Sequence, residues 1–374
     1  MQIRALLSVL VVMIFGFYSS ASTAAGDGED YVTGSFVLGS AERRMLLKSK
    51  NSSPSFSYSS RPCDRLPTRF HLGMPKTGSS SLYGYLVSHG LIGNSNHSKE
   101  VPFFIHANQT SAEYCDMYKY AGKHKKRPLF DMSVSHYFNL DLVAKFFEDD
   151  RATKDRVTFS VVYRDPITRL LSWYNHMAAF GMNVNSQKVG KIAPFNMESL
   201  RKYAEQDANN ALNSLNTYLI HFKPSQLLLM QYDDVQADFI LFAIKVAAHH
   251  GIISAEEAAK KKKKHLKQKQ LQVVVANGGK SGSRSGSGSR HPAAADMEEV
   301  PRWNTYKPRV TAAAIDCTLW KQLWAIYQPK YTAIANIVAT QDFAPGSATG
   351  LSSFLISAAT ASGKCRNEEG TGKY

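Results

Sequence analysis

Apolar residues form three short runs of the kind found in buried strands. The runs are Arg69–Gly73, Val157–Tyr163 and Leu227–Tyr232. The second run is rich in β-branched and aromatic residues, and the third is almost entirely apolar, so neither alternates as a half-exposed strand would. Each run has the length of a strand rather than of a helix. The pattern therefore predicts three strands that are buried on both faces.

A helical spacing of apolar positions follows each of these runs. The first helix is expected over Ser79–His89, and the third over Phe239 to about Ala248. Between them, Leu170, Leu171 and Tyr174 mark a helix after the second strand. Strands that alternate with helices favour a parallel sheet covered by helices on both faces, which is an α/β fold.

The C-terminal part of the chain is less regular. Lys260–Gln270 is expected to be a solvated basic segment, and Gln272–Val275 a short strand. Gly278–Ser289 is rich in Gly and Ser, which is typical of a flexible loop. A last helix is expected over about Ala312–Ala339, with an interruption at Pro329 because proline lacks the amide hydrogen.

The first residues have the layout of a targeting segment. Arg4 precedes an uncharged apolar stretch that ends near Tyr18, and small residues follow. The layout fits either a cleaved signal peptide or an uncleaved signal anchor, and both place the rest of the chain in a lumen. The expected organisation begins with a targeting segment (1–25) and a flexible stem (26–62). A folded domain (63–344) follows, with a basic and Gly/Ser-rich loop at 260–292, and the chain ends in a loosely ordered tail (345–374).

The chain carries 45 Lys and Arg against 30 Asp and Glu, a formal charge of +15. Such an excess indicates anionic partners such as nucleic acid, acidic polysaccharide, phosphorylated cofactors or a membrane surface. A lumenal location disfavours nucleic acid and nuclear import. The run Lys260–Lys264 is interpreted first as a solvated face or linker. The alternative is that it attracts an anionic polysaccharide.

Four cysteines and three glycosylation sequons fit a lumenal chain. An even number of cysteines in an oxidising compartment indicates up to two disulfides, with three connectivities left open. The cysteines are Cys63, Cys115, Cys317 and Cys365. No CxxC pair or Cys/His cluster occurs, so a structural zinc site has no support. The sequons begin at Asn51, Asn96 and Asn108.

The segment Gly73–Ser81, which reads GMPKTGSSS, has the composition of an anion-binding loop between a strand and a helix. Gly73 and Gly78 permit a tight turn, and the serine hydroxyls and first helical amides are hydrogen-bond donors for an anion. Lys76 adds a positive charge. A nucleoside-triphosphate loop requires lysine directly after the second glycine, where this chain has Ser79, so an ATP or GTP site is disfavoured.

Four segments resemble one enzyme family, in the family's order. Residues 75–86 (PKTGSSSLYGYL) resemble the 5′-phosphosulfate loop of PAPS-dependent sulfotransferases. Residues 99–104 (KEVPFF) resemble the K-E-x-x-F-F segment of heparan sulfate N- and 3-O-sulfotransferases. Residues 163–174 are similar to the family's R-[DEN]-P-x-x-R-x-x-S-x-Y motif, and residues 231–235 are a weaker match to a late Y-E/D-D/E-L segment. The resemblance spans roughly 69–339.

This resemblance implies a P-loop-like sulfotransferase fold, with a central parallel sheet flanked by helices. It also implies PAPS as the donor, whose 5′-phosphosulfate and 3′-phosphate need two separate anion sites. The residues expected at the 5′-phosphosulfate are Lys76, Thr77, Gly78, Ser79 and Ser80. Those expected at the 3′-phosphate are Arg164, with a bidentate guanidinium, and Ser172, together with Lys280 and Arg284 from the Gly/Ser-rich loop.

The resemblance also assigns the catalytic roles. Glu100 matches the family's catalytic glutamate and would remove the acceptor's proton as a general base. Lys76 would neutralise the charge that grows on the leaving phosphate, and no metal is needed for this. Lys99 and His106 are the expected substrate-binding residues.

Some residues within these motifs are expected to be structural. The sequence also departs from the family's pattern at two places outside them, Met132 and the stretch around Lys280. Arg169 is expected to pair within the fold, and Phe103 and Phe104 to pack in the core. Met132 stands where heparan sulfate enzymes carry a lysine near the acceptor, which weakens the case for a heparan-like acceptor. The stretch around Lys280 also lacks the family's cysteines, so a merely flexible surface loop remains an alternative there.

The sequence therefore predicts sulfuryl transfer from PAPS to a carbohydrate, such as an anionic polysaccharide, in the Golgi lumen. The protein would be a single-pass type II membrane protein or secreted into the lumen. Three alternatives stay open. One is sulfation of protein tyrosine or a small alcohol, and another is a catalytically silent polyanion-binding protein. The third is a secreted nucleotide kinase, which the position of Lys76 disfavours.

Overall fold

The structure is a computed structural model, which describes the eight ranges of residues that follow. The described residues are 66–93, 99–101, 103–104, 110–118, 127–179, 197–278, 317–347 and 350–360. The targeting segment and stem, the three sequons, His106, Lys280 and Arg284 lie outside these ranges. Within the described residues, no helix is both long and apolar enough to cross a bilayer.

The centre of the fold is a parallel sheet in the order β1-β2-β3. These strands are Arg69–Gly73, Thr158–Tyr163 and Leu227–Gln231. All three predicted strands are thus confirmed to within a residue at their ends. On the other side of β1, Asp131 forms a parallel bridge with Phe70 and extends the sheet by a short segment.

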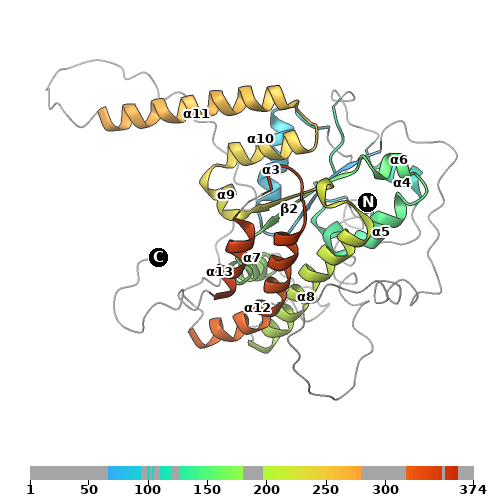
Figure 1. The fold of residues 1–374 in the computed structure, drawn as a ribbon, viewed down its shortest axis with the longest axis vertical. Helices are drawn as coiled ribbons and strands as arrows, with labels where there is room; N and C mark the ends of the chain where they lie inside the picture. The colour runs from blue at the N-terminus through green and yellow to red at the C-terminus, as the bar shows by residue number, and fades with distance from the viewer. Residues whose placement is uncertain are drawn as a thin grey trace.

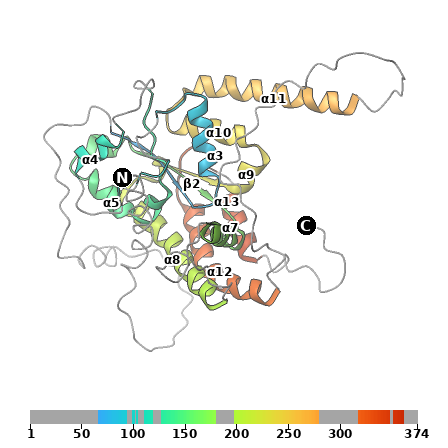
Figure 2. The ribbon, with the colours of Figure 1, turned by 180° about the vertical axis from the view of Figure 1, so that it is seen from behind.

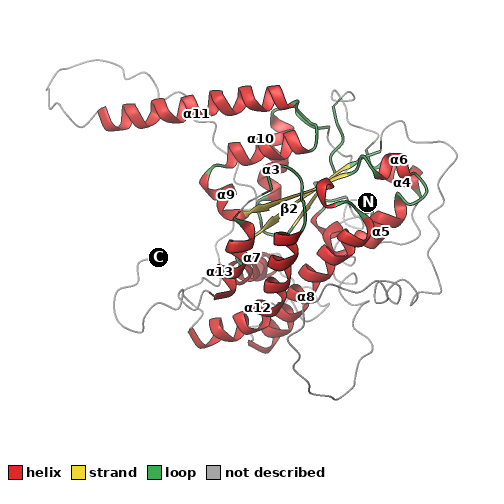
Figure 3. Cartoon of the chain, viewed as in Figure 1, coloured by secondary structure: helices red, strands yellow, loops and turns green. Residues whose placement is uncertain are grey.

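Helices cover both faces of the sheet, so the predicted α/β fold is confirmed (Figures 1 and 2). Figure 3 shows the strands as a narrow central layer within a largely helical molecule. The helices of eight or more residues are α3 (Ser79–Ser88), α7 (Pro166–Ala179), α8 (Met197–His221), α10 (Phe239–His249), α11 (Ala255–Gly278), α12 (Cys317–Thr340) and α13 (Leu351–Thr360). The shorter helices are α4 (Ser111–Asp116), α5 (Leu140–Phe146), α6 (Arg151–Lys154) and α9 (Tyr232–Ala237), with 3₁₀ turns at Val134–Phe138 and Pro224–Gln226.

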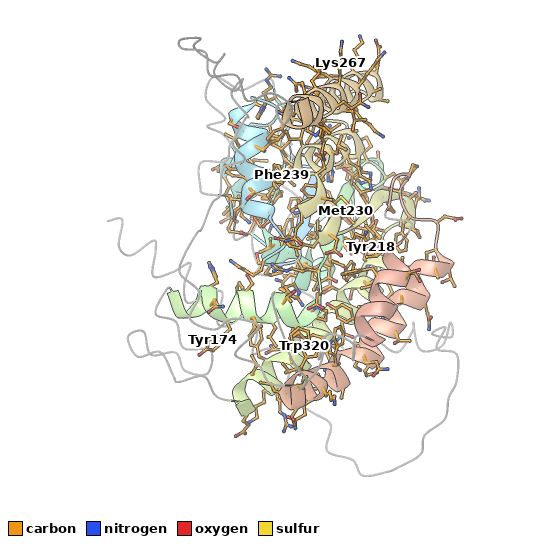
Figure 4. The ribbon with its side chains drawn as sticks, turned by 90° about the vertical axis from the view of Figure 1, so that its left-hand side faces the viewer. Tyr174, Tyr218, Met230, Phe239, Lys267 and Trp320 are labelled. Atoms are coloured by element: carbon orange, nitrogen blue, oxygen red, sulfur yellow. The ribbon has the colours of Figure 1, made fainter. Side chains whose placement is uncertain are left out.

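Successive residues of each strand point to opposite faces and therefore join different apolar clusters. Phe159 and Val161 pack in the larger cluster, with α5, α7, α8, α12 and α13. Val162 packs in the smaller cluster, with α3, α9 and α10. Figure 4 shows this division, with Phe239 on one side of Met230 and Trp320 on the other. Burial on both faces explains why the strands read as continuous apolar runs.

Two successive connections lead from β1 to β2, and they cover opposite faces of the sheet. After β1 it passes through α3 in the smaller cluster and reaches the bridge at Asp131, on one side of β1. It then passes through α5 in the larger cluster and enters β2, on the other side of β1. The carboxyl ends of β1 and β2 therefore lie at a point where the connections diverge, which is where open α/β sheets bind ligands.

The expected strand at Gln272–Val275 is wrong, because these residues belong to α11. The preceding residues, from Ala255, are mostly Ala, Glu, Lys and Gln, which are strong helix formers. Extending an existing helix fixes one residue for each new hydrogen bond, whereas an isolated strand of four residues has no partner. The extension of the helix therefore outweighs the local β-propensity of the valines.

The expected interruption at Pro329 is also wrong, since α12 runs without a break from Cys317 to Thr340. Tyr327, Tyr331 and Ile334 on either side of the proline are fully buried in the larger cluster. Pro329 itself is exposed on the solvent side of the helix. Burial of the flanking turns holds the helix together across the hydrogen bond that proline cannot make.

The expectation of a loosely ordered tail after residue 344 is wrong for Leu351–Thr360. These residues form α13, which packs against α12, and Leu351 and Leu355 are fully buried. The helix covers part of the larger cluster beside β3. Residues 361–374 lie outside the described part of the chain.

The residues expected to be structural are placed as predicted. Phe103 and Phe104 are fully buried in the larger cluster. Arg169 forms a buried ion pair with Asp207, so α7 is tied to α8. Cys115 is disulfide-bonded and Cys317 is not part of a disulfide. The pairing itself stays a prediction because the other two cysteines are outside the described residues.

Candidate active site

The loop after β1 adopts a strongly turned backbone. Gly73, Lys76 and Gly78 have positive φ angles of 94°, 67° and 90°. A side chain at Gly73 would bring its Cβ within 2.8 Å of Val134 Cγ1, so the backbone could not approach that segment with any larger residue. The loop therefore requires glycine here because of its conformation and because of its close packing.

The loop leads directly into α3, whose first turn faces the carboxyl end of the sheet. Thr77 is fully buried, and its hydroxyl donates a 2.6 Å hydrogen bond to the carbonyl of Met74, which closes the turn. Gly78 is the N-cap of α3, so the amides of Ser79 and Ser80 have no acceptor within the helix. Such amides, together with the helix dipole, make an anion-binding site. The Thr77 hydroxyl thus stabilises the shape of the loop.

Arg164 follows β2 and reaches the same loop. Its Nη1 donates a 2.8 Å hydrogen bond to the carbonyl oxygen of Lys76. Its guanidinium also lies over the ring of Tyr232, 4.3 Å from the ring centroid. Tyr232 is the first residue of α9, directly after β3. Residues that follow β1 and β3 thus hold the guanidinium that follows β2. Tyr232 belongs to the weak motif match at residues 231–235, and this contact gives that segment a place in the site.

Lys99 and Glu100 lie against the start of α3. Lys99 Nζ donates a 3.1 Å hydrogen bond to Ser79 Oγ and forms an ion pair with Glu100. The other oxygen of Glu100 accepts a 3.0 Å hydrogen bond from the amide of Val134. The side chain of Glu100 remains 25% exposed and that of Lys99 11%. A carboxylate is therefore held beside the anion-binding loop with part of its surface open.

A buried polar network fixes the segment that carries Val134. Asp131 accepts a 2.6 Å hydrogen bond from the Tyr114 hydroxyl and contacts His136 Nε2 at 3.1 Å. Its second oxygen accepts from the amide of Ser133, and the Ser133 hydroxyl accepts a 2.6 Å bond from the amide of Val101. Burial opposes the charge of Asp131, but His136 and these donors hold its pKa below the usual value. The backbone that follows Glu100 is thereby tied to the segment that carries Val134.

The positive charges of the site act on one another. Burial, then Arg164 and Lys99, lower the pKa of Lys76 to about 8. Each of these effects disfavours the charged form of Lys76, so binding of an anionic ligand would be favourable here. A bound phosphate or sulfate would counteract all three effects.

His176 is a site residue that sequence reasoning missed. It lies on α7, and burial, then the charges of Lys76 and Lys99, lower its pKa to about 4. The ring is therefore neutral at physiological pH and close to both lysines. Its position one helical turn after Ser172 could have revealed it, because residues four apart share a helix face.

Ser172 lies in the second turn of α7, and Ser80 in the first turn of α3. Both elements begin at the carboxyl ends of strands, so the fold brings both serines to the side where Arg164 lies. A contact between Ser172 and Arg164 remains a prediction. The roles expected of His106, Lys280 and Arg284 concern residues outside the described part of the chain.

Met132, which stands where heparan sulfate enzymes carry a lysine, packs in the core. Its side chain is fully buried in the smaller cluster, against the residues of α3 and α10. Only its carbonyl oxygen reaches the site, where it accepts a 3.4 Å hydrogen bond from Lys99. The positive charge of the family's lysine is therefore absent from this chain, and the methionine side chain fills the core instead.

The sulfotransferase domain family matches residues 68–295. The human bifunctional heparan sulfate N-deacetylase/N-sulfotransferase 3 is 28% identical over 191 residues, which cover 47% of this chain and 21% of that protein. The mouse proteins numbered 3 and 2 in the same series are 26% and 25% identical, over 45% and 47% of this chain and 20% and 21% of theirs. The match thus spans about a fifth of the length of these relatives.

Among solved structures, the chain is similar to a sulfotransferase from Alicyclobacillus acidocaldarius. The TM-score is 0.46 at 16% sequence identity, and the similarity covers 74% of this chain and 97% of the other. The family match includes β1, β2 and β3 and every described residue of the site. Because this match covers more than half of the sequence, the protein belongs to the sulfotransferase domain family and is a sulfotransferase enzyme.

Proposed function

We propose that the protein transfers a sulfuryl group from PAPS to a hydroxyl or amino group of a carbohydrate. The observation that carries this proposal is the hydrogen bond from Arg164 to the backbone of Lys76. It joins a guanidinium at the end of β2 to an anion-binding loop at the end of β1. A donor with two separate anionic groups matches such a pair of sites, with the 5′-phosphosulfate on the loop and the 3′-phosphate near Arg164 and Ser172.

In the proposed reaction, the acceptor oxygen or nitrogen forms a bond to sulfur as the bond from sulfur to the phosphate oxygen breaks. Glu100 takes the acceptor's proton, and the electron pair of the broken bond stays on the departing phosphate. Lys76 stabilises that charge, as do the first amides of α3. Lys99 holds Glu100 beside the loop through their ion pair. His176, neutral and near both lysines, is a second group that could accept or relay the proton.

A carbohydrate acceptor is supported by the relatives, whose names describe heparan sulfate N-sulfotransferases. Lys99 and His106 would contact that acceptor, and Lys280 and Arg284 would close over the 3′-phosphate. The charge that is missing at Met132 still counts against a heparan-like acceptor. Transfer to tyrosine or to a small alcohol is the alternative, and the experiment must distinguish it from transfer to a carbohydrate.

The proposed compartment is the Golgi lumen, with residues 1–25 as signal peptide or anchor and residues 26–62 as stem. The targeting pattern of the sequence supports this placement. Glycans at Asn51, Asn96 and Asn108 and the disulfide of Cys115 would be consistent with it. The proposed chemistry uses only the side chains and amides named above, without a metal.

The test uses the purified lumenal part of the chain and PAPS labelled at the sulfuryl group. The acceptors are desulfated polysaccharides, tyrosine peptides and a small alcohol, with Lys76→Ala as the matched inactive variant. Label that enters a polysaccharide in the wild type, and is lost in the variant, supports the proposal. Label that enters only the tyrosine peptide or the alcohol overturns the carbohydrate assignment, and label that enters no acceptor overturns the reaction.

A further inference from the structure

Helix α11 carries an unusual concentration of positive charge. Its 24 residues include seven lysines and two glutamates, which leaves five net positive charges. Three large apolar residues of the described chain are strongly exposed, and all three lie on this helix: Leu266, Leu271 and Val273. The proposed catalytic chemistry uses none of its residues, so the helix needs a separate account.

One side of α11 is fixed to the body of the protein. Ala258, Lys261 and His265 are half-buried and lie three and four residues apart, which places them on one face toward α10. His265 and Lys269 both contact Asp238, the N-cap of α10, at 2.9 Å and 3.1 Å. The helix is therefore held in a defined orientation rather than attached only at its first residue.

The opposite side presents a row of lysines to solvent. Lys260, Lys263, Lys264 and Lys267 are exposed, and at about 100° per residue they fall within roughly a third of the helix circumference. Glu256 pairs with Lys260 at 2.7 Å. Among the described residues, no carboxylate pairs with the other three lysines. The row extends over about 10 Å, given a rise of 1.5 Å per residue.

Helix α11 also projects from the body of the protein beyond α9 (Figure 1). In Figure 1, α11 runs above α10 and projects past α9, which follows the carboxyl end of β3. Figure 4 views the molecule from that side, and α11 points toward the viewer with Lys267 at its outer surface. The free end of α11 is therefore on the same side of the molecule as α9, which follows β3.

We infer that the lysine row Lys260, Lys263, Lys264 and Lys267 is a docking surface for an anionic polysaccharide, which is the acceptor or a continuation of the acceptor chain. This inference rests on the proposed function. Lysines in a row along one face of a rigid helix attract a repeating line of negative charge at long range. They raise the local concentration of the polymer without contacting the reacting group.

The composition of α11 disfavours other polyanions. It contains no arginine for bidentate phosphate contacts and no aromatic residue for base stacking, both of which nucleic-acid surfaces use. Its exposed apolar residues do not share one face, because Leu271 falls on the side of the lysine row and Leu266 and Val273 on the other. A helix that lies in a membrane surface needs a continuous apolar face.

The test compares two triple variants that lose the same charge. The first is Lys263→Gln, Lys264→Gln and Lys267→Gln on α11. The control is Lys202→Gln, Lys321→Gln and Lys330→Gln on α8 and α12, at the other end of the molecule (Figure 1). Binding to N-desulfated heparin, single-stranded DNA and vesicles with anionic lipid is measured at several salt concentrations. Transfer from labelled PAPS is measured to the same polysaccharide and to a disaccharide of its repeat.

The expected result is that the α11 variant binds the polysaccharide about tenfold more weakly at low salt, with a smaller salt dependence, while the control is unchanged. Its KM should rise for the polysaccharide and stay the same for the disaccharide. Equal polysaccharide binding by the α11 variant and wild type would overturn the docking surface. So would tighter binding of DNA or vesicles than of polysaccharide. Failure of the wild type to transfer label would instead contradict the proposed function.

Discussion

At the scale of single residues, Glu100 is placed by contacts that leave part of its carboxylate open. One oxygen accepts from the amide of Val134, and the other pairs with Lys99, which also bonds Ser79 at the start of α3. The carboxylate is thus connected to the anion-binding loop through one lysine. In the proposed reaction, a carboxylate held in this way accepts the acceptor's proton without leaving its position.

Replacing Glu100 with Gln should lower kcat by about 10²–10⁴-fold, because the amide keeps the shape but cannot take a proton. The affinity for PAP should stay close to that of the wild type, since Glu100 does not bind the nucleotide in this account. Steady-state kinetics and PAP titration on the same samples separate the two effects. A kcat within a few-fold of wild type would show that another group, with His176 the nearest candidate, is the base.

Lys76 gives the nucleotide site a pH dependence. Burial, Arg164 and Lys99 lower its pKa to about 8 in the free protein, so the ammonium loses its proton as the pH rises through 8. PAP binding should therefore weaken between about pH 7 and pH 9. Arginine keeps its charge throughout this range, so Lys76→Arg should bind PAP with little change across it. Equal pH dependence in both proteins, measured by titration calorimetry, would contradict the assignment.

At the scale of elements, α7 is held against α8 and α12 by a buried charge. Arg169 on α7 pairs with Asp207 on α8, which also accepts a 2.8 Å hydrogen bond from Tyr327 on α12. Both charged side chains are almost completely buried. Because α7 carries Ser172 and His176, this contact also fixes one wall of the site.

Asp207→Ala should lower the free energy of unfolding by about 3–5 kcal/mol, because it leaves the Arg169 charge buried without its partner. Urea denaturation measures the change. The control is Asp155→Ala, which removes an exposed ion pair with Lys223 and should leave the unfolding midpoint nearly unchanged. Similar losses in both variants would mean that the buried pair does not hold the three helices together.

The sequence predicts the elements of this fold where local and tertiary preferences agree. The three strands and the helices after them are short segments whose apolar residues all face the core, so the periodicity identifies them. It fails at Gln272–Val275 and Pro329, where a helix continues through residues that disfavour it. In α12 the cause is burial of distant residues against the flanking turns, which no local pattern contains. In α11 it is the extension of a long helix.

At the scale of the whole molecule, two histidines are buried on the side of the sheet that faces α10. His71 Nδ1 and His250 Nε2 each lie 2.9 Å from the hydroxyl of Ser160, which joins β1, β2 and the end of α10. Burial lowers both pKa values, that of His71 to about 3. Lys99 adds to the effect at His71, and His249 to that at His250. Both rings are therefore neutral in the folded protein.

The protein should lose stability as the pH falls below about 6.5, where these histidines take up protons only in the unfolded chain. Each contributes a slope of up to about 1.4 kcal/mol per pH unit, which persists toward the folded-state pKa. His71→Asn should reduce the slope by about one proton while leaving Ser160 a hydrogen-bond partner. Urea midpoints from pH 7.5 to 5 measure this. A variant with the wild-type slope would show that His71 is protonated in the folded state.

The candidate site could be predicted in part because its residues stand in contiguous motifs at the ends of strands. Lys76, Glu100 and Arg164 follow from those motifs, and the fold brings them to one edge of the sheet. His176 was missed because its role depends on its distance from Lys76 and Lys99, which lie far away in the sequence. The burial of Met132 was not predicted for a similar reason, since only packing decides which face of the segment enters the core.

The measurement that tests the account most directly is titration calorimetry of the folded protein with PAP in the presence of EDTA. The central claim is that the loop at Lys76 and the guanidinium of Arg164 form one site for a nucleotide with two anionic groups. We expect saturable binding to one site, which survives the chelator and is strongly weakened in Lys76→Ala and in Arg164→Ala. Absence of PAP binding by a protein that circular dichroism shows to be folded would contradict it.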